Sequence, residues 1–341
     1  MAESGLVIVD KSGGMTSHDV VARIRRLAGT RKVGHAGTLD PMATGVLVIG
    51  VEKATRLLGY LTLTEKEYDG TIRLGQATVT DDAEGEVLPP AEGLDADATT
   101  VSEAKLRSAL DTFVGQISQV PPRISAVKVD GERAYRLTRS GAAPELAARP
   151  VTITRLDLLA VRVAGPRLLD VDVSVTCSSG TYIRAIAREL GTSLRTGGHL
   201  TALRRTRVGP YGIARARTLE RLAENYEFTP LAEAAAAAFG CIHLNAEEAR
   251  LVSHGGRLPA SAGSLGPRGE GAGSEGNEPA GPAPTAVAGK AGLGRGETVA
   301  RPDEAGLASG VPVAAFDPDG SLTALLVREG DEIRPLAVFV P

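Results

Sequence analysis

The sequence predicts an α+β protein rather than a doubly wound α/β one. Segments with the alternating pattern of strands and segments with helical spacing follow one another in irregular order, without the regular βαβ rhythm of a parallel sheet. The hydrophobic content of 43% is sufficient for a core, which must be largely aliphatic because aromatic residues make up only 3%. A length of 341 residues predicts one large domain and a smaller one.

Strand and helix patterns alternate along residues 5–194. The first strand ends in a glycine turn, and Thr16 or Ser17 is the expected N-cap of an amphipathic helix that Gly29 closes. An acidic turn is expected at residues 80–90. Strands are predicted within residues 5–14, 46–51, 66–78, 151–163 and 167–180, and helices at residues 19–29, 102–115 and 181–194.

The C-terminal part has a different composition. A poly-alanine stretch ends at Gly240, which predicts a large domain at residues 1–240 and a small β-domain at residues 241–341. In the small domain, an Asp-Pro-Asp-Gly sequence at residues 317–320 is typical of a hairpin turn. Residues 261–311 are rich in Gly, Ala, Pro, Ser and Glu without periodicity, so we expect them to be a disordered insertion in that domain.

The charge is distributed unevenly along the chain, although the net charge is only -3. Residues 104–221 hold 20 Lys or Arg against 9 Asp or Glu, which gives +11. Residues 61–103 carry -9 and residues 241–341 carry -5. The basic segment predicts either a face that binds a polyanion or an ordinary solvated surface, and charge alone does not separate these two interpretations.

The cysteines and the N-terminus indicate a reducing cytoplasm. Cys177 and Cys241 provide neither a disulfide framework nor a cluster of metal ligands. The first residues lack the basic start and long apolar run of a signal peptide. No segment approaches the roughly 18 apolar residues that a membrane crossing needs. We therefore expect a cytoplasmic protein that does not contact membranes.

The loop around Asp40 is the most informative stretch. Gly34, Gly37 and Gly45 permit backbone conformations that side chains obstruct, and Pro41 biases the residue before it towards an extended conformation. The loop thus presents a carboxylate directly before a buried strand, as catalytic loops commonly do. An Asp-Pro pair alone would more often be a simple turn.

The whole string GHAGTLDP-x-ATG-x-L, residues 34–47, resembles the signature of the bacterial tRNA pseudouridine-55 synthases, the TruB family. The resemblance covers about residues 5–240, because four further segments match in order; Ile124 replaces the tyrosine that the family usually has there. These segments are VDKSGGMTSHDVVARIRR, EKEYDGTIRLGQATVTDDAEGEV, VPPRISAVKVDGERAYRLTRSG and CSSGTYIRAIARELG with GGHLTALRRTRVG. The resemblance implies a largely antiparallel central sheet with flanking helices and a small PUA-like C-terminal domain.

The resemblance also implies a reaction and its catalytic residues. The enzyme would flip uridine-55 out of the T-loop of tRNA, cleave its C1′–N1 bond and rejoin the base through C5. Asp40 would be the essential carboxylate, Arg184 its cationic partner, and Tyr68 the residue that stacks on the base and accepts the C5 proton. Because nothing is oxidised or hydrolysed, no cofactor is expected, and the sequence has no dinucleotide, phosphate-loop or metal-ligand motif.

Four further residues are expected to bind the substrate. The resemblance assigns Tyr182 and Leu203 to the uracil pocket, adds Lys66, and places His35 where the flipped base leaves a gap. Three of the assigned residues have an ordinary alternative: Tyr68 as a half-buried packing residue, Leu203 as a core leucine and His35 as a loop histidine bonded to local backbone. Phosphate contacts are expected collectively from Arg23, Arg25, Arg26, Arg31, Lys32, Arg204, Arg205 and Arg207.

Two other functions fit parts of the pattern. The first is a tRNA-binding folding factor, an RNA chaperone in which catalysis is secondary. The second is a carbohydrate-active enzyme in which Asp40 pairs with Asp69 or Asp82, since paired carboxylates split glycosidic bonds. The leading hypothesis remains the isomerase, acting as a monomer on the T arm of tRNA and needing no protein partner.

Overall fold

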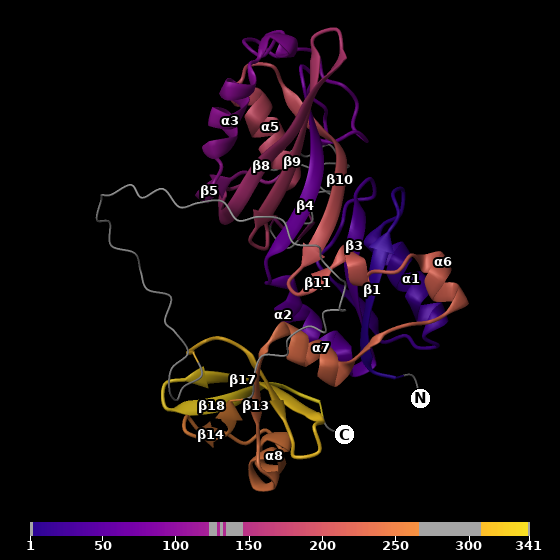
Figure 1. Cartoon of the computed structure of the whole chain (residues 1–341), viewed down its shortest axis with the longest axis vertical. Helices are drawn as coiled ribbons and strands as arrows, with labels where there is room; N and C mark the ends of the chain where they lie inside the picture. The colour runs from indigo at the N-terminus through magenta and orange to yellow at the C-terminus, as the bar shows by residue number, and fades with distance from the viewer. Residues whose placement is uncertain (1–2, 123–127, 130–131, 134–145, 266–307, 340–341) are drawn as a thin grey trace, which may run out of the picture. The chain divides into compact units, whose positions relative to one another are not determined.

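A computed structural model describes residues 3–122, 128–129, 132–133, 146–265 and 308–339 (Figure 1). Ile124 and most of the expected insertion, residues 266–307, lie outside the described residues. The chain divides into two compact units, Met1–Ala234 and Ala235–Pro341, which we call unit 1 and unit 2.

Unit 1 is built on one large mixed sheet. Its described strands are β1 (Gly5–Lys11), β2 (Val33–Ala36), β3 (Thr44–Val51), β4 (Lys66–Leu74), β5 (Gly115–Gln119), β8 (Arg149–Gly165), β9 (Leu168–Cys177), β10 (Gly198–Val208), β11 (Tyr211–Gly212) and β12 (Thr229–Pro230). The order is β12-β1-β3-β10-β4-β9-β8-β5, with β2 beside β3 and β11 beside β10. Among these described pairings β3–β10 is parallel and the others are antiparallel. A short separate pair is formed by β6 (Lys128–Val129) and β7 (Glu132–Arg133).

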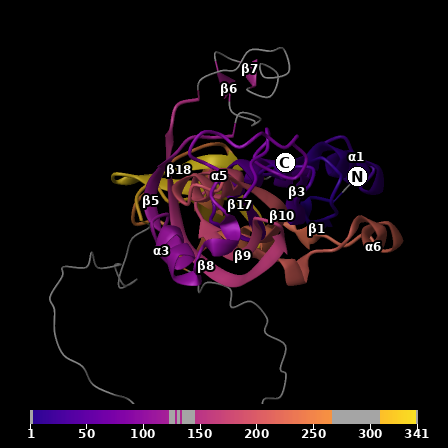
Figure 2. The same cartoon turned by 90° about the horizontal axis from the view of Figure 1, so that it is seen from above.

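Helices flank this sheet at both of its ends. The described helices are α1 (Ser17–Leu27), α2 (Leu58–Thr62), α3 (Glu103–Asp111), α5 (Ile183–Ser193), α6 (Leu219–Glu224) and α7 (Leu231–Ala238), with short 3-10 turns η1 (Glu52–Leu57), η2 (Ala98–Thr100) and η3 (Ile213–Arg215). Helix α1 packs on β2, α3 on β8 and α5 on β10. Figure 2 shows α1 beside the β1–β3 end of the sheet and α3 beside the β5–β8 end. The fold is thus α+β with a mixed, largely antiparallel sheet, as the sequence predicts.

The start of α1 resolves the choice between its two candidate caps. The Thr16 hydroxyl accepts from the Asp19 amide at 3.1 Å, and the Asp19 carboxylate accepts from the Thr16 amide at 2.9 Å, which completes a capping box. Ser17 is instead the first helical residue and turns its hydroxyl inward, to the backbone of Leu39. The cap therefore frees Ser17 to hold the loop that carries Asp40.

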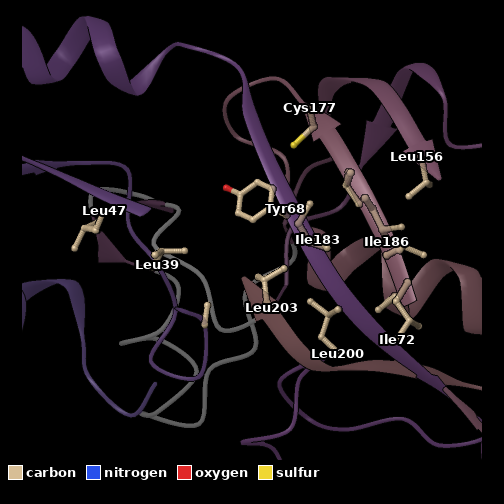
Figure 3. Close-up of a cluster of buried hydrophobic side chains, with 14 of the residues drawn as sticks. Leu39, Leu47, Tyr68, Ile72, Leu156, Cys177, Ile183, Ile186, Leu200 and Leu203 are labelled. Atoms are coloured by element: carbon tan, nitrogen blue, oxygen red, sulfur yellow. The ribbon is translucent and has the colours of Figure 1, made fainter. Parts of the chain in front are cut away.

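The core of unit 1 is mostly aliphatic and extends to the base of the Asp40 loop. It joins side chains of β1, β3, β4, β9, β10 and the helices α1, α3 and α5. Figure 3 shows part of it, with Ile72, Ile186 and Leu200 packed together and Leu203 beside Tyr68. The loop that carries Asp40 is thus packed against a dense core, which limits its movement.

Unit 2 is a six-stranded sheet around a smaller aliphatic core. Its described elements are β13 (Gly240–His243), α8 (Ala246–Ser253), β14 (Leu258–Pro259), β15 (Ser264–Leu265), β16 (Val313–Phe316), β17 (Leu322–Glu329) and β18 (Glu332–Val338). The expected hairpin joins β16 to β17, where the Asp317 carboxylate accepts from the Ser321 amide at 2.8 Å. None of the helices in the described part of the chain has the length and apolar content that a membrane crossing requires.

Candidate active site

The Asp40 loop, residues 37–43, joins β2 to β3. Gly37 has φ +84° and Gly45, just after the loop, has φ +97°, conformations that L side chains rarely adopt. A Cβ on Gly45 would lie 2.2 Å from the carbonyl oxygen of Arg205, so only glycine permits the close approach of β3 to β10. The glycines noted in the sequence therefore set the path of the chain on both sides of Asp40.

Asp40 faces a buried guanidinium from another element. Arg184, in the first turn of α5, lies with Nε 3.0 Å from Asp40 Oδ2 and donates from Nη2 to Oδ1 at 3.1 Å. The Arg184 side chain is 6% exposed, whereas that of Asp40 is 33% exposed. The pair is thus joined by two close nitrogen–oxygen contacts, of which the one from Nη2 is a hydrogen bond, and the carboxylate remains reachable from outside.

The other side of Arg184 contacts a second carboxylate. Its Nη1 lies 3.3 Å from Asp82 Oδ2 and donates to the Thr80 carbonyl at 2.9 Å. The Thr80 hydroxyl in turn donates to Asp82 Oδ1, and the Glu84 amide donates to the same oxygen at 3.1 Å. The Arg184 guanidinium is thus held between two carboxylates, those of Asp82 and Asp40.

Burial and charge act in opposite directions on Asp40. Desolvation raises the pKa of the Asp40 carboxyl, and the nearby Asp82 adds to that rise. The Arg184 guanidinium and, more weakly, Lys11 oppose it. The net result is a pKa above the ordinary value for aspartate, so Arg184 limits how far burial favours the neutral acid.

A cavity of about 410 Å³ opens at this ion pair. Six of the seven residues that the sequence assigns to catalysis or substrate binding line it: Asp40, Lys66, Tyr68, Tyr182, Arg184 and Leu203. The seventh, His35, lies on β2 with its ring 5.6 Å from that of His18 and is not among the lining residues. Burial and neighbouring cations lower the pKa of His35, which favours a neutral imidazole.

Tyr68 and Leu203 form an apolar wall of this cavity. In Figure 3 the Tyr68 ring projects from β4 beside Leu203, with its hydroxyl directed away from Ile72 and Ile186. Burial raises the pKa of the Tyr68 phenol, and the positive charge of the nearby Arg205 guanidinium opposes that rise. The ring therefore presents a flat apolar face whose hydroxyl is a neutral hydrogen-bonding group near pH 7.

Lys66 lies at the bottom of the cavity, at the start of β4. Its ammonium donates to the carbonyls of Thr62 and Thr64 at 2.8 and 2.7 Å. Burial, reinforced by the charge of Arg205, lowers its pKa to about 8. Lys66 is therefore a buried cation in the wall of the cavity.

Gln119 is a site residue that the sequence did not reveal. Its side-chain amide donates to the Tyr182 carbonyl at 3.1 Å and accepts from the Tyr182 amide at 2.8 Å. These paired bonds fix Tyr182 at the N-cap of α5, two residues before Arg184 in the cavity wall. An isolated glutamine in a strand gives no signal of this kind, because its partner is distant in sequence.

One expected phosphate contact is wrong. Arg205 is 1% exposed, and its guanidinium donates to the carbonyls of Val46 at 2.7 Å and Gly37 at 3.1 Å, so it cannot reach a phosphate. Arg204 pairs with Asp10 at 2.7 Å and Arg207 with Glu65 at 2.8 Å, both at the surface. Arg204 and Arg205 are adjacent on β10 and face opposite sides of the sheet. An irregularity in the register between Arg205 and Arg207 places Arg207 opposite Glu67 rather than on the face of Arg205.

The arrangement suits chemistry at a sugar or base carbon. It places a reachable carboxylate, the buried guanidinium groups of Arg184 and Arg205 and the aromatic face of Tyr68 around a space large enough for a small ligand. Among the described residues, no three His, Cys, Asp or Glu side chains gather closely enough to hold a metal ion.

Solved structures share the fold over nearly the whole chain. The structure entitled "Crystal Structure of a Cbf5-Nop10-Gar1 Complex" is 25% identical with a TM-score of 0.67, and covers 99% of this chain and 85% of its own. "Structure of H/ACA RNP bound to a substrate RNA containing 2'-deoxyuridine" is 24% identical with a TM-score of 0.66 over the same shares. Both comparisons agree with the fold of the pseudouridine synthases.

Sequence comparisons complete the assignment. The family model "TruB family pseudouridylate synthase (N terminal domain)" matches residues 25–183, and "tRNA pseudouridylate synthase B C-terminal domain" matches residues 184–237. Fold and sequence together define a pseudouridine synthase, an isomerase that acts on tRNA.

Within that class the chain belongs to the TruB family. The protein called tRNA pseudouridine synthase B in Arthrobacter sp. (strain FB24) is 53% identical over 99% of this chain and 97% of its own length. That of Thermobifida fusca (strain YX) is 60% identical over 78% of this chain and 89% of its own. Family membership excludes the carbohydrate-active alternative, and Asp69 is an exposed residue that does not line the cavity.

Proposed function

We propose that this enzyme isomerises uridine-55 in the T arm of tRNA, with Asp40 as the essential carboxylate. The observation that carries the proposal is the ion pair of Asp40 with the buried Arg184 at the wall of the 410 Å³ cavity. A base within a folded loop cannot reach such a cavity while stacked. The enzyme therefore extrudes it, at a cost of about a few kcal/mol.

The reaction breaks the C1′–N1 bond and forms a C1′–C5 bond. One proton leaves C5 and one is gained at N1, so the product is an isomer of the substrate. Asp40 acts either as a nucleophile at C1′ or as a base that removes a proton from the sugar. Both routes need the ionised carboxylate, and Arg184 favours that form against the effect of burial.

The remaining cavity residues bind and orient the base. Tyr68 stacks on the uracil, and its hydroxyl takes up the C5 proton while it releases its own proton to solvent, from which N1 gains one. Tyr182 and Leu203 enclose the ring. Two of the three ammonium hydrogens of Lys66 are bonded to carbonyls, which leaves the third for an oxygen of the substrate. His35, a neutral ring outside the cavity, occupies the gap that the flipped base leaves.

We further propose how the enzyme meets its substrate. Unit 2 is a PUA-like module that contributes RNA contacts, and the domain boundary falls near Gly240. The enzyme acts in the cytoplasm as a monomer, and the exposed arginines of unit 1 contact phosphates of the T arm without reading sequence.

The test of the target position uses two unmodified tRNA transcripts, one with uridine and one with cytidine at position 55. We expect pseudouridine at position 55 of the first transcript and none in the second. Product at another position of both transcripts would contradict the proposed target. Tight binding of the first transcript without any product would instead favour the folding-factor function.

A further inference from the structure

The backbone of the Asp40 loop is bonded at every carbonyl from residue 37 to residue 41. Gly37 and Thr38 accept from Arg205 at 3.1 and 3.4 Å, and Leu39 accepts from the Ser17 hydroxyl at 3.2 Å. The carbonyl of Asp40 accepts from the amide of Ala43 at 3.1 Å, and that of Pro41 accepts from the Lys11 ammonium at 3.1 Å. The carbonyls of this irregular loop are therefore hydrogen-bonded as completely as those of a paired strand.

Arg205 makes more of these contacts than the other side chains. Its Nε donates to the Val46 carbonyl at 2.7 Å, at the start of β3, while its Nη1 and Nη2 reach the loop itself. A Cβ on Gly37 would lie 3.5 Å from Arg205 Nη1, so the guanidinium packs directly under the loop. The planar fork fits several acceptors at once, which an ammonium cannot do.

Arg205 also adjoins the aromatic residue of the site. On β10 it lies opposite Gly45 of β3 on one side and Tyr68 of β4 on the other. Its positive charge acts on the Tyr68 hydroxyl. One side chain is therefore bonded to the loop that carries Asp40 and adjacent to the residue that is proposed to hold the base.

A buried guanidinium is a costly way to stabilise a core. Arg205 is 1% exposed, and no carboxylate pairs with it among the described ion pairs. An apolar side chain of similar volume commonly serves stability as well or better. The position of Arg205 is better explained by the geometry that it imposes on its neighbours.

We propose that Arg205 is a positioning residue that fixes the Asp40 loop and the Tyr68 ring relative to each other. The inference rests on the proposed function, because it gives Arg205 a role only if Asp40 and Tyr68 act on the substrate. Arg205 lines the cavity, but its guanidinium is bonded to backbone carbonyls, so we assign it to holding its neighbours rather than to binding the RNA. Its loss should slow the chemical step while leaving tRNA affinity unchanged.

The experiment compares Arg205→Lys and Arg205→Met with Arg73→Lys as a matched control. Arg73 lies on β4 and pairs with Asp170 at 2.8 Å, without a contact to the Asp40 loop. For each folded variant we would measure the melting temperature, the Kd for unmodified tRNA and the single-turnover rate with enzyme in excess. Displacement of reacting groups by about 1 Å costs on the order of a hundredfold in rate.

We expect Arg205→Lys to lower the single-turnover rate roughly 10- to 100-fold with Kd unchanged, and Arg205→Met to lower it further. Arg73→Lys should keep the wild-type rate, whatever its melting temperature. A wild-type rate for Arg205→Lys would overturn the inference, as would a rate loss matched by an equal loss of tRNA affinity.

Two additional variants keep the outcome decisive. If neither Arg205 variant folds, Arg205→Gln keeps an amide donor without the guanidinium fork, and a wild-type single-turnover rate for it overturns the inference. Asp40→Asn separates the two proposals. If Asp40→Asn is inactive while Arg205→Lys is unimpaired, the inference alone fails. A fully active Asp40→Asn would remove the proposed function and the inference with it.

Discussion

At the scale of single residues, the Arg184 guanidinium opposes the effect of burial on the pKa of the Asp40 carboxyl. Desolvation and Asp82 favour the neutral acid at position 40, whereas the guanidinium 3.0 Å away favours the anion. Because Asp40 stays partly exposed, substrate binding would remove water from it and strengthen both effects. We therefore expect the Arg184 guanidinium to have a larger effect on the pKa of Asp40 in the tRNA complex than in the free enzyme.

The pH dependence of the rate tests this role of Arg184. In Arg184→Gln the opposing charge is gone, so the pKa of Asp40 rises further and the acid limb of the rate profile moves to higher pH. We expect a shift of about one unit or more in single-turnover profiles. Arg188→Gln is the control, since Arg188 lies one turn along α5 and pairs with Asp81 at 2.6 Å. An unmoved limb in Arg184→Gln would contradict the assignment.

The same pKa shift predicts a stability effect. The pKa of Asp40 is higher in the folded protein than in the unfolded chain, so the folded state loses stability as pH rises through that window. Asparagine resembles the neutral acid and avoids this loss. We therefore expect Asp40→Asn to melt at the same temperature as the wild type or higher at pH 7, with the difference vanishing in acid. A lower melting temperature at pH 7 would show that the ionised pair stabilises the fold.

Gly45 illustrates how the elements determine the site. It begins the parallel contact between β3 and β10 with a positive φ, and a side chain there would meet the Arg205 backbone. At that contact the Asp40 loop joins the centre of the sheet. A substitution of Gly45 should therefore lower the stability of the fold and displace the Asp40 loop.

We expect Gly45→Ala to destabilise the protein by about 2 kcal/mol or more, because it combines backbone strain with a clash. Gly59→Ala is the matched control. Gly59 lies in α2, where an added Cβ would meet nothing within 4 Å, so alanine should stabilise the helix by up to about 1 kcal/mol. Thermal unfolding of the two variants measures the contrast, and equal melting temperatures would refute it.

The elements differ in how far the sequence predicts them. Alternation gave β1, β3, β4, β8 and β9, and helical spacing gave α1, α3 and α5, each within a few residues of the observed bounds. Strand β10 was not predicted, although it lies between β3 and β4 near the middle of the sheet. Its three arginines hide the apolar pattern, because one of them is buried by long-range bonds to backbone carbonyls.

The residues of the site also differ in how far the sequence predicts them. The family motifs indicated the residues that line the cavity, because the proposed chemistry requires a carboxylate, a cation and an aromatic ring. The motifs did not indicate the residues whose hydrogen bonds hold these side chains and the loop in place. Lys11, Gln119 and Arg205 act through backbone partners far away in sequence, and no local spacing shows which partner each will find.

At the scale of the whole molecule, charge is distributed unevenly. Unit 1 contains both the basic segment 104–221 and the acidic segment 61–103, and unit 2 contains the acidic segment 241–341. Several arginines of unit 1 are neutralised by partners, such as Arg162 by Asp172. The cations that remain at the surface are those available to phosphates.

Salt should therefore weaken tRNA binding more than catalysis. Counterion release predicts that affinity falls roughly tenfold or more between about 50 and 200 mM KCl if several phosphates are contacted. The single-turnover rate at saturating enzyme should change little, because the Arg184 guanidinium is buried and poorly screened. Filter binding and rapid-quench assays measure the two quantities. Salt-independent affinity would contradict phosphate contacts.

The central claim is that the carboxylate of Asp40 performs the chemistry. Its most direct test is the release of tritium from tRNA labelled at C5 of uridine, measured in single turnover for the wild type and Asp40→Asn at equal tRNA saturation. The account predicts that Asp40→Asn binds tRNA as tightly as the wild type and releases tritium slower by roughly four orders of magnitude or more. Release by Asp40→Asn within about tenfold of the wild-type rate, beyond what a contaminating enzyme could supply, would contradict it.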